Sequence, residues 1–130
     1  MSTRIFLADD HDIVREGLRS LLEEEDGFEV VGEAANGRAA VEQAIELQPD
    51  VATFDIAMPE LNGIEATTRL HQACPNVKII ILSMYSTQEY IFRALRAGAL
   101  GYILKESAGA EIVRAIRMVL EGHRFVSPKV

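Results

Sequence analysis

Several short apolar runs in this sequence end on a side chain that can do chemistry. The runs cover residues 5–8, 51–54, 77–82 and 101–104, and they end on Asp9 with Asp10, on Asp55, on Ser83 and on Lys105. A carboxylate beside a metal, an ammonium and a hydroxyl can accept a phosphoryl group as an acyl phosphate. These side chains therefore predict phosphoryl transfer if the fold brings them to one place.

Asp55 has the most informative surroundings. It ends the apolar run 51–54 and is followed by Pro59 and by Asn62-Gly63, residues that favour a turn before a helix. This pattern places Asp55 where a strand of an open α/β sheet emerges at its carboxyl edge, which is where such folds bind ligands. A turn-initiating Asp is the alternative, and the other strand ends decide against it.

The elements that must position these residues alternate along the chain. Strands are predicted at 5–8, 28–34, 51–55, 77–83 and 101–104, and helices around 13–22, 40–47, 64–73, 87–97 and 108–121. Asp12 is expected to cap the first helix, and Gly98 to end the fourth. Charges interrupt strand 28–34, which suits a sheet edge, whereas the β-branched run 77–83 suits a central strand.

This alternation predicts an α/β fold of the flavodoxin-like (βα)5 type, a doubly wound parallel sheet with strand order 2-1-3-4-5. In that order the first and third strands are neighbours, so Asp9, Asp10 and Asp55 converge. Each pair of carboxylates about 4 Å apart would cost roughly 4 kcal/mol at an effective dielectric near 20, so a cation must help to hold them. Oxygen ligands favour Mg²⁺, and we expect His11 to be a solvated loop residue rather than a ligand.

Bulk properties narrow the function classes. The 130 residues suffice for one domain, and a net charge of −7 without a Lys or Arg run argues against unaided nucleic-acid binding. The single cysteine, Cys74, excludes an internal disulfide, fits a reducing compartment and reads as an ordinary residue near a helix end. The sequence lacks a signal-peptide pattern or an apolar stretch of membrane-spanning length, so we expect a soluble, cytoplasmic protein without a membrane partner.

The sequence resembles a response-regulator receiver domain over essentially its full length. The resemblance is carried by Asp9-Asp10, Asp55-x-x-Met58-Pro59-x-x-Asn62-Gly63, Ser83 and Gly98-Ala99-x-Gly101-Tyr102-x-x-Lys105. It implies that Asp55 is the phosphoacceptor for a histidine kinase, and that Asp10, Asp55 and the backbone carbonyl of Ala57 coordinate Mg²⁺ while Asp9 acts mostly through metal-bound water. It also implies that Ser83 and Lys105 contact the phosphoryl group and that Tyr102 is the aromatic switch.

Finer motifs, Asp9-Asp10-His11 with Arg15-Glu16-Gly17-Leu18 and the ending Glu121 to Pro128, resemble the NarL/FixJ branch, in which a LuxR-type helix-turn-helix domain follows a linker. This resemblance implies a receiver over 1–122, the start of a linker over 123–130, and DNA binding only through a domain absent from this chain. We expect either an excised or a stand-alone receiver, and the abrupt stop after Pro128 favours excision. It also implies homodimers through the first and last helices, control of transcription in the full-length protein, and no catalysis beyond the domain's own phosphorylation and autodephosphorylation.

Two departures from the family pattern stand out. Glu106 follows Lys105 where many receivers have a cis proline, so this bond is either trans or strained. Ala57 and Tyr85, two places after Asp55 and Ser83, lie where water would approach and are expected to tune the lifetime of the phosphoryl group.

Three other functions compete with this interpretation. A degenerate receiver that acts as a phosphorylation-independent binding module is the main alternative, although intact Asp10, Asp55 and Lys105 speak against it. A haloacid-dehalogenase-type hydrolase would want a second acid at position 57, where this chain has Ala57. A flavin site would want a phosphate-cradling loop after the first strand, where two acids stand instead.

Overall fold

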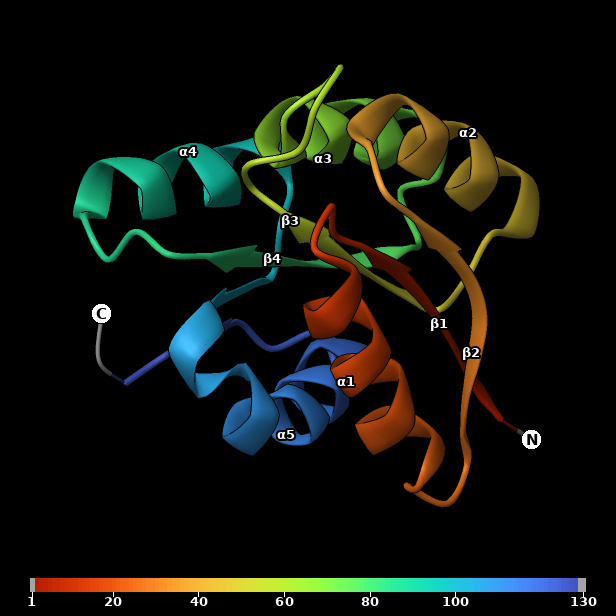
Figure 1. Ribbon diagram of the computed structural model, residues 1–130. Coiled ribbons are helices and arrows are strands. Elements are labelled where there is room, and N and C mark those ends of the chain that lie inside the picture. Colours follow the sequence, from red (N-terminus) through yellow and green to blue (C-terminus); the bar gives the residue numbers. More distant parts are fainter. Residues whose placement is uncertain (1, 129–130) are drawn as a thin grey trace.

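A six-stranded parallel sheet lies between two layers of helices in the computed structural model, which describes residues 2–128 (Figure 1). The strands are β1 Thr3–Ala8, β2 Phe28–Ala34, β3 Val51–Asp55, β4 Lys78–Ser83, β5 Gly101–Leu104 and β6 Phe125–Val126. The helices are α1 Asp12–Glu23, α2 Gly37–Leu47, α3 Gly63–Ala73, α4 Gln88–Ala97 and α5 Ala108–Leu120, and a 3₁₀ turn, η1, covers Lys105–Ser107. The order β2-β1-β3-β4-β5-β6 confirms the predicted flavodoxin-like order and adds a strand at the β5 edge.

The sheet buries both of its faces, which explains why its central strands are apolar without strict alternation. One face packs against α1 and α5 with residues such as Leu7 and Ile103, and the other packs against α2, α3 and α4 with residues such as Phe54 and Ile81 (Figure 1). Burial of each such side chain contributes about 1.5 to 3 kcal/mol. As predicted, β4 is a central strand and β2, which keeps partly exposed positions, forms an edge.

Most helix ends follow the turn chemistry of the sequence. Asn36 and Asn62 cap α2 and α3, each accepting a backbone N–H three residues further on. Gly98 ends α4 with a φ of 119°, a left-handed conformation that glycine adopts at little cost, which confirms its predicted role.

The first helix begins differently from our expectation. His11, rather than Asp12, occupies the cap position, with φ −92° and ψ 106°. Its backbone N–H donates to Asp9 Oδ1 at 2.8 Å, which fixes the loop in an extended form. Asp12 is therefore the first helical residue, where its carboxylate pairs with Arg15 at 2.7 Å and complements the positive helix terminus.

The segment 123–128, which lies in the stretch expected to start a linker, packs onto the domain. Its β6 strand pairs in parallel with β5, and Phe125 is buried. Ser127 Oγ accepts a hydrogen bond from the Leu104 backbone N–H at 3.0 Å and donates one to Glu111 at 2.6 Å. That a linker starts at 123 remains a prediction, and residues 129–130 lie outside the described part.

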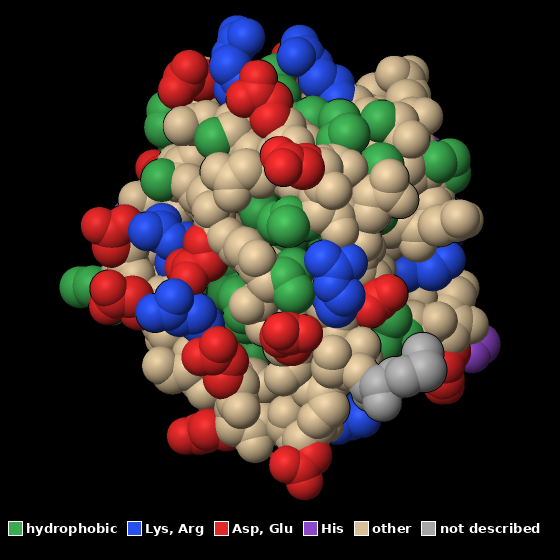
Figure 2. Space-filling model, turned by 90° about the vertical axis from the view of Figure 1, so that its right-hand side faces the viewer, with side chains coloured by type: hydrophobic (Ala, Val, Ile, Leu, Met, Phe, Trp, Pro, Cys, Tyr) green, Lys and Arg blue, Asp and Glu red, His purple; other side chains and the backbone are tan. Residues whose placement is uncertain are grey.

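The surface of the described part mixes charges of both signs. On the face shown in Figure 2, basic side chains lie among acidic ones rather than in a continuous positive patch. Arg15 and Arg19, for example, both pair with Glu33, at 3.0 and 2.6 Å. Among residues 2–128, the helices lack the combination of length and apolar character that would let one cross a bilayer.

Candidate functional site

The carboxyl edge of the sheet gathers the two buried carboxylates and the lysine. Asp9 follows β1, Asp55 ends the neighbouring β3, and Lys105 follows β5. Both aspartates are 1% exposed, and Lys105 Nζ lies 2.9 Å from Asp55 Oδ2 and 3.1 Å from Asp9 Oδ2. The predicted convergence of these three side chains is therefore what the structure shows.

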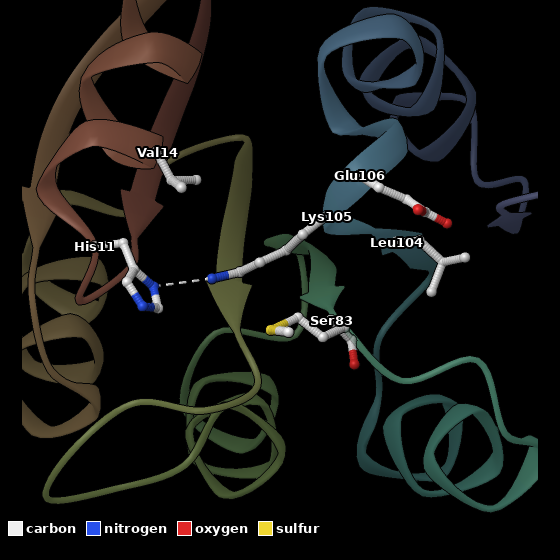
Figure 3. Close-up of a pocket in the computed structure, with 7 residues that line it drawn as sticks. His11, Val14, Ser83, Leu104, Lys105 and Glu106 are labelled. Carbon is white, nitrogen blue, oxygen red and sulfur yellow. Dashed lines mark hydrogen bonds between the residues drawn. The ribbon is translucent and has the colours of Figure 1, made fainter.

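Asp10 and His11 complete the cluster from the loop after β1. One ligand atom from each of Asp9, Asp10, His11 and Asp55 lies within 4.8 Å of the others. His11 lies on this loop with its side chain 59% exposed, as expected for a solvated loop residue, and its Nδ1 lies 3.2 Å from Lys105 Nζ (Figure 3). The hydrogen bond from the His11 backbone to Asp9 turns the loop back and brings the ring over the acids.

Ser83 lies near this cluster but does not face it. It is fully buried and lines the same cavity of about 510 Å³ as His11 and Lys105. Its Oγ accepts a hydrogen bond from the Tyr85 backbone N–H at 2.9 Å, and Figure 3 shows the hydroxyl directed away from Lys105. The structure thus places Ser83 at the predicted strand end, with its hydroxyl engaged elsewhere.

Tyr102 is tied to the same loop as Ser83. Its ring is fully buried, and its hydroxyl donates to the Tyr85 carbonyl at 2.6 Å. Burial raises the pKa of Tyr102, so the phenol stays protonated and remains a hydrogen-bond donor. The backbone of Tyr85 therefore contacts both Ser83 and Tyr102.

The loop after β3 folds tightly around Asp55. The Ala57 backbone N–H donates to Asp55 Oδ1 at 3.2 Å, and the Gly63 N–H donates to the Ile56 carbonyl at 3.0 Å. A Cβ on Gly63 would stand 2.4 Å from the Asp55 carbonyl oxygen, which is closer than real contacts allow. Only glycine lets α3 begin this close to Asp55, which gives a physical reason for Asn62-Gly63 in the sequence.

Burial and charge oppose each other at Asp55. Burial is the largest influence and raises the pKa of Asp55, the hydrogen bond from Lys105 lowers it, and the charge of Asp9 raises it. The net result is a pKa of about 6. For Lys105, burial alone would lower the pKa, but the hydrogen bond and the charge of Asp55, with those of Asp9, outweigh it and raise the pKa. The ammonium is therefore the charge that stabilises ionised Asp55.

The acids also fit a metal ion. Asp9 Oδ2 is buried and, among residues 2–128, accepts no hydrogen bond, although Lys105 Nζ lies 3.1 Å away. A buried carboxylate oxygen without a hydrogen bond is costly unless a cation approaches it. Three carboxylates at one sheet edge are the ligand type that hard divalent cations prefer, so this cluster could hold a metal.

Comparison with known proteins agrees with this geometry. The family described as "Response regulator receiver domain" matches residues 5–117. The chain belongs to the response-regulator receiver family. The hydrolase and flavin-binding interpretations are thereby set aside.

The relatives of this receiver belong to the NarL/FixJ branch that the sequence predicts. The receiver is 40% identical over 127 residues to the response regulator GacA of Pseudomonas viridiflava, and 40% identical over 127 residues to the transcriptional regulatory protein DegU of Brevibacillus brevis. These matches cover 98% of the receiver chain but 59% of GacA and 54% of DegU. The chain thus spans little more than half the length of the curated relatives it matches.

Solved structures give the same result. A LuxR-family two-component response regulator from Aurantimonas sp. superimposes with a TM-score of 0.94 at 41% identity, covering 99% of this chain and 92% of that one. The isolated receiver domain of RcsB from Salmonella enterica, solved in the presence of BeF₃⁻, gives 0.90 at 27% identity and covers 100% of this chain and 96% of that one. The Lys105–Glu106 bond of the present receiver is trans, the first of the two options left open by its sequence.

Proposed function

We propose that this receiver accepts a phosphoryl group on Asp55 from a histidine kinase. The observation that carries the proposal is the pairing of buried Asp55 with Lys105 at 2.9 Å, beside Asp9, where Lys105 also lines a cavity. Buried acids at the end of a parallel strand, paired with a single lysine, serve no evident packing purpose. Family membership and the relatives named as response regulators support the same role.

Mg²⁺ is the proposed cofactor. Asp10, Asp55 and the backbone carbonyl of Ala57 would hold it directly, and Asp9 would hold it mostly through bound water. When bound, the ion screens the negative charge of the carboxylates and of the incoming phosphoryl group.

The side chains of this chain supply the rest of the transfer. An oxygen of Asp55 attacks phosphorus as the bond from phosphorus to the kinase histidine nitrogen breaks, and the electron pair of that bond stays on the nitrogen. Lys105, now beside Asp55, would pair with a phosphoryl oxygen, and Ser83 would donate its hydroxyl to another. We propose catalysis of this transfer and of autodephosphorylation only, with Ala57 and Tyr85 near the path of the attacking water.

A conformational switch is proposed through the Tyr85 backbone. Ser83 can reach a phosphoryl group only by giving up its hydrogen bond from the Tyr85 N–H, while Tyr102 holds the Tyr85 carbonyl. A change at Ser83 therefore alters the loop to which Tyr102 is bound, and with it the α4–β5–α5 face. The buried ring seen here is the position that phosphorylation should favour.

Beryllofluoride, a phosphoryl mimic, tests the switch. Side-chain NMR of Tyr102 should show the buried rotamer gaining population when Mg²⁺ and beryllofluoride are added to the free protein. An unchanged rotamer distribution would contradict the proposal, and Asp55→Asn should show no response in the same titration.

Incubation with acetyl phosphate and Mg²⁺ tests the phosphoacceptor. Intact-mass analysis should show an adduct of one PO₃H unit on the wild type and on the control Asp26→Asn, an exposed acid away from the cluster. The adduct should be absent from Asp55→Asn. A wild type that never gains the adduct would favour the alternative, a degenerate receiver that acts as a binding module.

The wider context is also proposed. Relatives of greater length, among them the transcriptional regulator DegU, suggest that the receiver covers 1–122, that a linker begins over 123–130, and that DNA binding belongs to a helix-turn-helix domain. A cytoplasmic location and homodimers through α1 and α5 complete the proposal.

A further inference from the structure

His11 has contacts that no single hydrogen-bonding state can satisfy. Its Nδ1 lies 3.2 Å from Asp9 Oδ1, 3.2 Å from Asp10 Oδ1 and 3.2 Å from Lys105 Nζ. A protonated Nδ1 suits the carboxylates but opposes the ammonium, which can only donate, whereas an unprotonated Nδ1 suits the ammonium but opposes the carboxylates. A metal ion that accepts the lone pairs of the imidazole nitrogen and of the carboxylate oxygens would remove the conflict.

The spacing of these atoms fits one metal ion. Two adjacent ligands of an octahedral ion, each about 2.1 Å from it, stand about 3.0 Å apart, and two opposite ligands stand about 4.2 Å apart. The Nδ1 of His11 lies 3.2 Å from Asp10 Oδ1 and 4.0 Å from Asp55 Oδ2, which belong to the two acids proposed as direct ligands. These separations span the range from adjacent to opposite ligands of one ion.

Two further observations point to a cation among these atoms. Asp9 is 1% exposed, and its Oδ2 accepts no hydrogen bond from residues 2–128. The Lys105 ammonium lies within 3.2 Å of Asp9 Oδ2, Asp55 Oδ2 and His11 Nδ1, so a positive charge already lies among the same donor atoms. Figure 3 shows its contact with His11. The imidazole nitrogen is nearly as close to that charge as the carboxylate oxygens are, at 3.2 Å against 2.9 and 3.1 Å.

We propose that His11 is a direct ligand of the bound cation and gives this site a preference for first-row transition-metal dications such as Co²⁺, Ni²⁺ and Zn²⁺. Imidazole nitrogen suits these ions, whereas Mg²⁺ takes oxygen ligands and keeps its waters. Asp10 and His11 are adjacent in the chain, so one short loop presents both ligand types at little entropic cost. The inference rests on the proposed cation site.

Calorimetric titration of the untagged chain with Ni²⁺ and, separately, Mg²⁺ tests the proposal. His11→Ala should lower the affinity for Ni²⁺ about tenfold or more. Its loss of Ni²⁺ affinity should exceed its loss of Mg²⁺ affinity by a factor of about ten or more. His123→Ala, which removes an exposed histidine from the turn after α5, is the matched control and should bind Ni²⁺ as the wild type does. Asp55→Asn should weaken the binding of both metals, which would show that Ni²⁺ binds at this cluster.

Pulsed EPR of bound Mn²⁺ gives a readout that does not depend on the stability of a variant. The wild type should show a hyperfine coupling to directly bound nitrogen, and His11→Ala should lack it. Equal loss of Ni²⁺ and Mg²⁺ affinity in His11→Ala, unchanged Ni²⁺ affinity, or a wild type without nitrogen coupling would each overturn the role of His11. A wild type that binds neither metal would instead overturn the proposed cation site itself.

Discussion

Asp55 and Lys105 show how strongly a buried pair depends on both partners. Asp55 is almost fully removed from water, and Lys105 is the cation within hydrogen-bond distance of it among the described residues. Removing one member of a buried ion pair leaves an uncompensated charge that costs several kcal/mol. A metal ion or a phosphoryl group that changes the charge balance of this pair should therefore change the free energy of the folded state.

The first prediction concerns pH and Asp55. Its pKa is about 6 in the folded state against an ordinary value of 3.8, so ionising this carboxyl costs more in the folded protein than in the unfolded chain. The stabilising contribution of the protonated form is complete below pH 4 and is lost as the pH rises through 6. Asn at this position does not titrate, so the difference in unfolding free energy between Asp55→Asn and wild type should grow by about 1 kcal/mol between pH 5 and pH 7.5.

Urea unfolding in the presence of a chelator measures that difference. Chelation matters because a bound cation would favour the carboxylate and hide the effect. A difference that stays constant across this pH range would show that the carboxyl of Asp55 has an ordinary pKa in the folded state.

Residue-level reasoning from the sequence found the acids and the lysine but not the orientation of their neighbours. Asp9, Asp55 and Lys105 were predictable because each ends a strand and parallel strands bring their ends to one edge. His11 points toward the acids because its backbone hydrogen-bonds to Asp9, and the Ser83 hydroxyl points away from Lys105 because it hydrogen-bonds to the Tyr85 backbone. The position of a residue at a strand end does not specify these hydrogen bonds.

At the level of elements, hydrophobic patterning carried most of the prediction. The five main strands, their helices and the edge position of β2 follow from apolar runs, charges and turn residues. The strand β6 could not be found in this way, because two residues are too short for any periodicity. The prediction that Asp12 caps α1 was wrong. Asp12 is a residue type that favours the cap position, but the hydrogen bond between the His11 backbone and Asp9 places the helix start one position earlier.

The second prediction concerns the hydrogen bonds of Ser127, which hold β6 against the sheet. Ser127 is buried and serves both the Leu104 N–H and Glu111. Ser127→Ala leaves the Leu104 N–H without its acceptor, so the free energy of unfolding should fall by about 1 to 3 kcal/mol. Urea denaturation followed by circular dichroism measures the change, and the exposed Ser86→Ala serves as the control. Equal stability of Ser127→Ala and wild type would mean that β6 does not hold the sheet edge in solution.

At the scale of the whole molecule, the balance of charge favours cation binding. The chain carries a net charge of −7, and the site itself holds three carboxylates against one lysine. Any cation that enters the cluster therefore relieves repulsion locally and reduces the net negative charge of the fold.

The third prediction is that Mg²⁺ stabilises the fold through this cluster. An ion that binds only the folded state, at tenfold its dissociation constant, should add about 1.4 kcal/mol to the free energy of unfolding. Thermal melting with and without Mg²⁺ measures this gain. Asp10→Asn should lose it, whereas Asp12→Asn, which alters an exposed acid two residues along and outside the cluster, should keep it. The absence of a shift in wild type, or an equal shift in Asp10→Asn, would argue against the proposed metal site.

The docked β6 strand fixes where any continuing polypeptide would leave the fold. A segment joined after residue 128 would begin beside the carboxyl end of β5, which Lys105 follows. It would not begin at the C-terminus of α5. A tethered module would then search a restricted volume next to one side of the receiver, at a high effective concentration for that side. Detachment of β6 from β5 would lengthen the tether and lower that effective concentration. The stability of the β5–β6 pairing would therefore set the volume that the module can reach.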